Sequence, residues 1–147
     1  MCAEKMEILK TCALLNKKGE KVDLATDTPL ALYFSGHFCA PCLTFTPLLK
    51  DFYEEVNEDD KKIEIIFVSL DKTVEEQEAY HKEHGDWPRI AFSNESERQA
   101  LKSLMGVEKI PALIVLDDSK KAAKYTDGVN DVRNMGPMAL DLKWTAC

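Results

Sequence analysis

Three runs of apolar residues predict the buried strands of a sheet. The segments LALYFS (30–35), IEIIFVSL (63–70) and ALIVLD (112–117) are almost continuously apolar, which is the pattern of a strand covered on both faces. EILKTCALLN (7–16) predicts a further strand, and KKGEKVDL (17–24) predicts a glycine-containing turn that leads to another short one. We expect LALYFS to be central in the sheet.

The stretches between these runs have the spacing of helices. In LTFTPLLKDFYEEV (43–56), apolar side chains recur at helical positions, namely Phe45, Leu48, Leu49, Phe52 and Val56. TVEEQEAYHKEHG (73–85) predicts a charged surface helix with a threonine cap and a terminal glycine. NESERQALKSLMG (94–106) predicts another helix, and a last amphipathic segment begins after Gly128 and ends at a Gly-Pro pair (136–137).

The order of these elements predicts the fold class. Strands that alternate with helices indicate βαβ crossovers and a parallel core, to which WPRIAF (87–92) adds a short extended piece. The turn DSKK (118–121) and the segment AAKYTD (122–127) then predict an antiparallel edge strand. We therefore expect an α/β fold with a central mixed β-sheet flanked by helices on both faces, in a single domain over residues 1–147. Ligands on such sheets bind beyond the carboxyl ends of the central strands, where SGHFCAPC (35–42) falls.

Composition narrows the class of partner. The chain has 45% hydrophobic and 31% charged residues, an ordinary globular balance, and its net charge of -7 disfavours nucleic acid or an anionic membrane surface as the main partner. It contains no run of about 18 apolar residues that could span a membrane, and MCAEKMEILK at its start lacks the apolar core of a signal peptide. Five cysteines, an odd number, suit a reducing compartment. We expect a protein of the cytoplasm, or also of the nucleus, that does not act at a membrane.

Two of these cysteines, Cys39 and Cys42, stand three positions apart at the predicted junction of strand and helix. Residues three apart on a helix lie on one face, near the separation that a disulfide needs. The unpaired amides and positive dipole end of a helix start favour a thiolate at Cys39, while Cys42 lies one turn further in and is more shielded. Pro41 suits the first helical turn, whereas Pro47 inside the helix is expected to kink it. The pair therefore predicts thiol–disulfide exchange, with Cys39 as the attacking sulfur and Cys42 as the resolving one.

A zinc site is the alternative interpretation of the cysteine pair. His81 and His84 form an HxxH that could in principle complete four ligands. Their spacing is shorter than that of zinc fingers, and no knuckle glycine lies near the cysteines. We expect neither a metal nor another cofactor.

At this point the residues resemble a known family. YFSGHFCAPCLTFTPLLKDFY, followed by IEIIFVSLD and KIPALIVLD, resembles the thioredoxin superfamily and, within it, the tryparedoxin and nucleoredoxin branch, over about residues 28–127. The resemblance implies a thioredoxin-like fold, with Cys39 as nucleophile and Cys42 as resolving thiol. It also implies that Pro111 is a cis proline facing them, and that the backbone of Ile110 is turned toward the substrate.

The sequence departs from the pattern of this branch at the site. Phe38 stands where the family has tryptophan before the first cysteine, Leu43 replaces the arginine after the second, and Leu70 replaces the tryptophan of FVSWD. The reducing partner of the family can therefore not be assigned to this chain by resemblance. Tyr33 occupies the position of the buried acid of thioredoxin itself, so the proton acceptor for Cys42 is open. His37 could help to hold a thiolate, but we favour a solvent-facing loop residue.

The remaining candidates have simpler interpretations. Trp87 resembles a tryptophan that the branch carries near its site, so it is a candidate for the substrate-binding rim, but packing against the sheet is the favoured interpretation. Trp144 is expected to anchor the C-terminal tail, and Cys12 to pack as a small apolar residue. The terminal cysteines Cys2 and Cys147 have no expected role.

We therefore expect a monomeric thiol–disulfide oxidoreductase, a disulfide reductase. Protein disulfides would be its clients, and an upstream thiol reductant would recharge it. The expected substrate contacts are Phe38, Ala40, Pro41, Ile110, Pro111 and Trp87. The rival class is a redox-sensitive binding module of the same fold with little turnover, because Phe38 and Leu43 make the rim more apolar. A peroxidase is disfavoured, since the resolving cysteine is vicinal.

Overall fold

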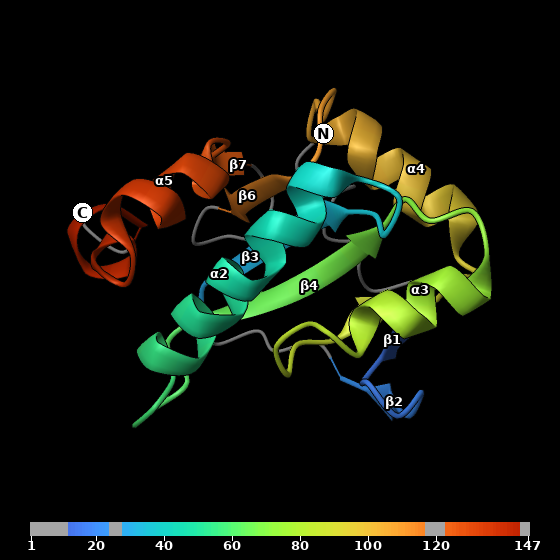
Figure 1. Ribbon diagram of the computed structural model, residues 1–147, viewed down its shortest axis with the longest axis horizontal. Coiled ribbons are helices and arrows are strands. Elements are labelled where there is room, and N and C mark those ends of the chain that lie inside the picture. The colour runs from blue at the N-terminus through green and yellow to red at the C-terminus, as the bar shows by residue number, and fades with distance from the viewer. Residues whose placement is uncertain (1–11, 24–27, 117–122, 145–147) are drawn as a thin grey trace.

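The structure is a computed structural model that describes residues 12–23, 28–116 and 123–144. Seven strands form one sheet in the order β2-β1-β5-β4-β3-β6-β7 (Figure 1). The strands are β1 (Leu14–Leu15), β2 (Lys21–Val22), β3 (Leu30–Ser35), β4 (Glu64–Ser69), β5 (Arg89–Ile90), β6 (Ala112–Leu116) and β7 (Ala123–Tyr125). The helices are α2 (Ala40–Val56), α3 (Val74–His81), α4 (Glu95–Leu104) and α5 (Gly128–Met135), followed by the π-helix η1 (Leu140–Trp144).

Strand β3 lies at the centre of the sheet, as its apolar run predicts. It pairs in parallel with β4 and antiparallel with β6, so that Tyr33 lies opposite Phe67 on one side and Leu113 on the other. All six residues of β3 and all six of β4 are buried. The edge strand β7 pairs antiparallel with β6, which confirms the predicted mixed sheet.

Alternate residues of β3 face two separate cores. Ala31 and Tyr33 pack in the core that contains residues of α2 and α5, whereas Leu32 and Phe34 pack in the core that contains Leu101 of α4. This alternation is the period of two of an extended chain. Helices therefore cover both faces of the sheet, and the α/β class with a thioredoxin-like fold is confirmed.

Two predicted elements, the strand over 7–16 and the turn over 118–121, lie partly or wholly outside the described residues. Of the predicted strand 7–16, only Leu14–Leu15 is extended among the residues that the structure describes; it pairs antiparallel with β2 and β5. The predicted turn at 118–121 falls in the range that is not described. Within the described ranges, no helix has the length and apolar character needed to span a membrane.

The predicted charged surface of α3 is confirmed on one face of the helix, where most of the charged residues are exposed, but the prediction missed a second, buried face. Gln77, Tyr80 and His81 are buried, and His84, just after the helix, is also buried. The rings of Tyr80 and His84 pack on Phe67 of β4, with centroid distances of 5.5 and 4.3 Å. These side chains form a stripe at helical spacing that an apolar count does not detect, because its members carry polar atoms.

One position of the α2 stripe also differs from the prediction. Leu48 is 45% exposed, while Phe45, Leu49, Phe52 and Val56 are buried. The buried four follow spacings of four, three and four, which is one face of the helix. Leu48 lies one residue off that face and is partly exposed for this reason.

Candidate active site

Cys39 caps the helix that follows the central strand. Strand β3 ends at Ser35, and α2 begins at Ala40 after a short loop. Cys39 has an extended backbone (φ -103°, ψ 112°), and its Sγ accepts a hydrogen bond from the backbone amide of Cys42 at 3.4 Å. Pro41 occupies the first turn, where its missing N–H leaves no bond unmade. The sulfur of Cys39 thus stands at the positive end of the helix, among amides that stabilise negative charge.

The two sulfurs differ in their access to solvent. Cys39 is half-buried and Cys42 is buried, and both are free thiols. Burial, followed by the neighbouring Cys39, raises the pKa of Cys42 to about 12, while hydrogen bonds from the Ser35 side chain and the Gly36 backbone lower it. An outer accessible sulfur therefore lies beside an inner shielded one.

The loop before β6 reaches the outer sulfur. The peptide bond between Ile110 and Pro111 is cis, and the thiol of Cys39 donates to the carbonyl oxygen of Ile110 at 3.7 Å. Ile110 and Pro111 are half-buried, so part of each faces solvent beside the thiol. Residues that are 71 positions apart in the chain are in this way brought to one place.

The surface around Cys39 is apolar. Phe38 is 58% exposed, Leu43 is 39% exposed, and Ala40 and Pro41 are exposed as well. Of the predicted contact residues, Phe38, Ala40 and Pro41 flank Cys39 in sequence, and Ile110 joins them through its hydrogen bond.

The expected rim position of Trp87 is wrong, because the side chain is only 1% exposed. Its ring meets that of Tyr53 edge to face at 5.1 Å and that of Tyr33 at 6.3 Å. Its Nε1 donates to Nδ1 of His84 at 3.0 Å. Trp87 therefore packs against the sheet, which is the interpretation favoured from the sequence, and its indole N–H finds a partner inside the core.

The histidines of the HxxH are engaged inside the protein. Arg89 donates to Nδ1 of His81 at 2.7 Å, which leaves Nε2 to donate to the carbonyl of Trp87, also at 2.7 Å. Burial lowers the pKa of His81 to about 4 and that of His84 well below its usual range. Across the described residues, no cluster of three or more His, Cys, Asp or Glu side chains is arranged to hold a metal ion.

His37 lies in the loop before the thiols, and its ring turns toward the end of α3. The ring stacks on Tyr80 with a centroid distance of 5.4 Å, and Nε2 lies 3.7 Å from a carboxylate oxygen of Glu83. Its backbone amide donates to Asp71 at 2.7 Å, and Asp71 accepts from Ser69. The loop that precedes Cys39 is thus tied to the residues that follow β4.

Sequence reasoning missed a group of buried hydroxyls beneath Cys42. We call Tyr33, Ser35, Thr46 and Tyr80 the hydroxyl cluster. Tyr80 lies 2.6 Å from both Ser35 and Thr46, and Tyr33 lies 2.7 Å from Thr46. The sequence pattern that could have indicated this cluster is a hydroxyl side chain at a position expected to be buried. Ser35 ends a buried strand, and Thr46 lies on the inner face of α2.

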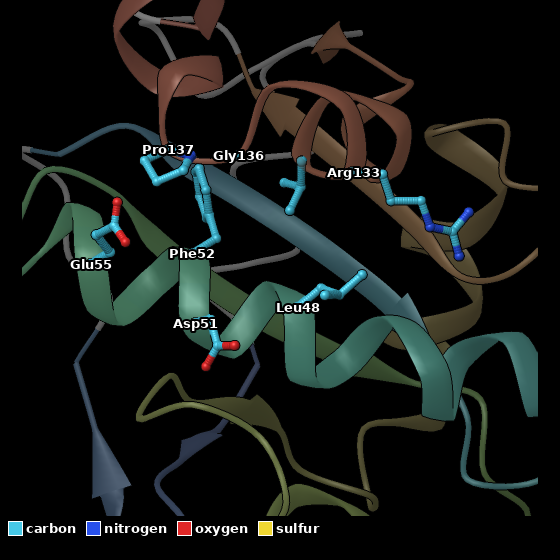
Figure 2. A pocket seen from close by; sticks show the side chains of 8 residues that line it. Leu48, Asp51, Phe52, Glu55, Arg133, Gly136 and Pro137 are labelled. Atoms are coloured by element: carbon cyan, nitrogen blue, oxygen red, sulfur yellow. The ribbon is translucent and has the colours of Figure 1, made fainter.

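A groove between α2 and α5 lies apart from the cysteines. Figure 2 shows Phe52 pointing from α2 toward Pro137. The lining residues are Leu48, Asp51, Phe52, Glu55, Val132, Arg133, Gly136 and Pro137. Neither Cys39 nor Cys42 lines this groove, so it does not belong to the site.

Comparison with known proteins identifies relatives of this fold and site. A family model described as thioredoxin-like matches residues 27–122. Nucleoredoxin of Bos taurus is 35% identical over 106 residues, which are 71% of this chain and 24% of that protein. Tryparedoxin of Trypanosoma brucei brucei is 36% identical over 107 residues, 71% of this chain and 72% of that protein. The structure of tryparedoxin I from Leishmania major matches with a TM-score of 0.82 at 28% identity and covers 99% of each chain.

The mixed sheet and the cysteine pair at the helix start define a protein of the thioredoxin superfamily. Within this superfamily, the chain belongs to the nucleoredoxin and tryparedoxin branch of the thioredoxin-like family. It spans about a quarter of the length of the nucleoredoxins that it matches.

Proposed function

We propose that the protein is a thiol–disulfide oxidoreductase that reduces protein or small-molecule disulfides through Cys39 and Cys42. The observation that carries the proposal is the pair of free thiols at the start of α2, one half-buried and one buried. A sulfur that attacks a client has to be reachable, and a sulfur that resolves the intermediate has to be adjacent. The pair meets both requirements.

The reaction has two steps. The thiolate of Cys39 attacks one sulfur of the client disulfide; a new S–S bond joins Cys39 to the client, and the other client sulfur leaves with the electron pair and takes up a proton. Cys42 then loses its proton and attacks Cys39, which releases the second client sulfur and leaves a Cys39–Cys42 disulfide. The client has gained two electrons, and an upstream thiol reductant restores the pair.

The roles of the sulfurs follow from their surroundings. Cys39 receives the amide hydrogen bond of Cys42 at the helix start, which stabilises a thiolate. Cys42 is buried and its pKa is raised to about 12, so it holds its proton until the mixed disulfide has formed. This order prevents the inner sulfur from competing for the client.

Protein disulfides suit the surroundings of Cys39. Phe38 is exposed beside Ala40 and Pro41, and the half-buried Ile110 and Pro111 add to this apolar surface. An exposed apolar surface favours contact with a protein, and the backbone near Ile110 would offer strand-like hydrogen bonds to an extended peptide.

The proposal is tested by the reduction of insulin disulfides with dithiothreitol as the reductant. We expect turnover by the wild type, no turnover by Cys39→Ser, and a covalent client complex that accumulates with Cys42→Ser. Cys12→Ser is the control thiol variant, and it should retain turnover because Cys12 packs against the opposite core. Retained activity in Cys39→Ser would refute the assignment.

The second candidate is a redox-sensitive binding module, which is favoured by the exposed Phe38 and Leu43. Such a module would hold one partner in only one redox state and reduce insulin no faster than dithiothreitol alone. Turnover measured beside a pull-down with the reduced and the oxidised protein separates the two functions.

We also propose that the chain works as a monomer in the cytoplasm or the nucleus. Free thiols at Cys39 and Cys42 and an odd total of five cysteines suit a reducing compartment. Sedimentation equilibrium and localisation of a tagged chain are the corresponding measurements.

A further inference from the structure

The second step of the proposed reaction requires negative charge on a buried sulfur. Burial raises the pKa of Cys42 to about 12, so deprotonation costs more here than at the surface. Tyr33 occupies the place where thioredoxin keeps an acid, and it is buried with a pKa raised above its ordinary value, chiefly by desolvation. Tyr33 is therefore a neutral hydroxyl and not a base.

The hydroxyl cluster lies beside Cys42. The Ser35 side chain lowers the pKa of the Cys42 thiol, and the hydroxyl of Tyr80 donates to the backbone carbonyl of Cys42 at 3.4 Å. Ser35 in turn lies 2.6 Å from the hydroxyl of Tyr80, which also lies 2.6 Å from Thr46. Thr46 donates to the backbone carbonyl of Cys42 at 2.9 Å. The cluster thus binds the backbone of Cys42 and also lowers the pKa of its sulfur.

A hydroxyl can turn its hydrogen between two acceptors. Ser35 donates to the hydroxyl of Tyr33 at 3.3 Å, and it also acts on the thiol of Cys42, whose pKa it lowers. Tyr80 can donate to Ser35, which frees the Ser35 hydrogen for the sulfur. When Cys42 ionises, the chain Tyr80 to Ser35 to Cys42 can therefore align, and each bond strengthens the next.

We propose that Ser35 is a catalytic residue that donates a hydrogen bond to the Cys42 thiolate, and that Tyr80 is the positioning residue behind it. This inference rests on the proposed function. The hydroxyl cluster stabilises the thiolate as the proton leaves, and that proton balances the one taken up by the departing client thiolate. The bond between Cys39 and the client breaks as the bond between Cys39 and Cys42 forms.

The other titratable groups near the cluster define the controls. Cys39 acts directly on the thiol of Cys42, and Tyr33 of β3 is bonded to Thr46. Two histidine rings contact the ring of Tyr80. The ring centroid of His84, just after α3, lies 4.4 Å from that of Tyr80, and the ring centroid of His37, in the loop after β3, lies 5.4 Å from it. Because the histidines touch Tyr80 and not the sulfur, replacing Ser35 separates the effect of the hydroxyl from theirs.

The test uses 5,5′-dithiobis(2-nitrobenzoate) in stopped flow, with Cys2, Cys12 and Cys147 replaced by serine in the full chain. Attack by Cys39 releases one coloured thiolate, and attack by Cys42 on the mixed disulfide releases the second. The two phases therefore report the two sulfurs separately. Both phases are measured across pH for the parent chain, Ser35→Ala, Tyr80→Phe and Tyr53→Phe.

We expect Ser35→Ala to slow the second phase about tenfold and to move its pH profile up by about one unit, since a hydrogen bond to a charged group is lost. The first phase should not change. Tyr80→Phe should also slow the second phase, but by a smaller factor than Ser35→Ala. Tyr53→Phe removes another buried tyrosine hydroxyl, bonded to Glu64 at 2.8 Å, and should leave both phases unchanged.

An unchanged second phase in both Ser35→Ala and Tyr80→Phe would overturn the role of the cluster and leave the proposed function intact. Equal slowing of the two phases would also overturn it, because that result indicates a general structural defect. A parent chain that releases only one equivalent would instead refute Cys42 as the resolving thiol, and with it both proposals. Ser35→Thr keeps the hydroxyl, and recovery of the second phase in this variant is the result that a purely structural role of Ser35 does not predict.

Discussion

The guanidinium of Arg89 donates a hydrogen bond to Nδ1 of His81 at 2.7 Å in the protein interior. This bond requires a neutral imidazole, because a protonated Nδ1 has no lone pair to offer. His84, whose ring centroid lies 5.7 Å from that of His81, is buried as well. The two histidines therefore couple the stability of the fold to pH.

We predict that the free energy of unfolding falls between pH 7 and pH 5. The folded pKa of His81 is about 4, below its ordinary 6.5, so within that range the unfolded chain binds a proton that the folded chain excludes. The stabilisation is complete above about pH 6.5 and lost as the pH drops toward 4, a change of about 2 kcal/mol by pH 5 for this one group. Urea denaturation at the two pH values measures it.

The control for this prediction is His81→Gln, which keeps a neutral donor and acceptor and should lose less stability on acidification than the wild type. An identical pH dependence in the variant would contradict the assignment.

We predict that Trp87→Phe destabilises the fold without affecting the chemistry. The substitution leaves a cavity beside Tyr53 and removes the N–H that His84 accepts at 3.0 Å, so the free energy of unfolding should fall by roughly 1–3 kcal/mol. Insulin turnover per folded molecule should stay the same. A raised KM with an unchanged free energy of unfolding would contradict this prediction and indicate that Trp87 contacts the substrate.

We predict that Phe38→Ala weakens the binding of protein clients. The ring is 58% exposed, so its removal should change stability by less than about 0.5 kcal/mol. Loss of about 1 kcal/mol of apolar contact should raise KM for insulin about fivefold. Met138→Ala, at a side chain that is also 58% exposed, is the matched control and should leave KM unchanged.

We predict that Asp131→Ala loosens the carboxyl-terminal segment. Asp131 accepts from Nε1 of Trp144 at 3.0 Å, and the ring of Trp144 packs edge to face on Phe52 at 5.2 Å. Without the carboxylate, the buried indole N–H loses the acceptor that Asp131 provides, which should cost about 1–3 kcal/mol in urea denaturation. Asp131→Asn keeps an acceptor oxygen and should lose less; equal losses would indicate that charge and not the hydrogen bond is responsible.

The sequence predicted the parts of the fold that a continuous pattern specifies. LALYFS is the central strand because a run without polar side chains is stable only with both faces covered. The anchoring role of Trp144 is confirmed by its burial, and the position of Cys39 at the helix start follows from the apolar spacing that begins after Cys42. Local signals were sufficient for these elements.

The remaining parts depend on partners that are distant in sequence. From the sequence alone, a surface helix with polar side chains is the expected setting of Tyr80, His81 and His84. Their burial is explained by packing on the ring of Phe67 in β4. The same holds for the hydroxyl cluster, in which Ser35 meets Tyr80 across 45 positions and Tyr33 meets Thr46 across 13. The periodicity of the sequence does not predict such pairs, because each hydroxyl finds its hydrogen-bond partner only when the helices have packed on the sheet.

The alternation of β3 between two cores makes the site intolerant of length changes in that strand. Inserting or deleting one residue between Leu30 and Ser35 would exchange which side chains enter each core, because a slip of one position inverts an extended chain. The same slip would turn the Ser35 hydroxyl away from Cys42. Divergence in chain length is therefore expected in the loops, while the spacing from the strand to the cysteines stays fixed.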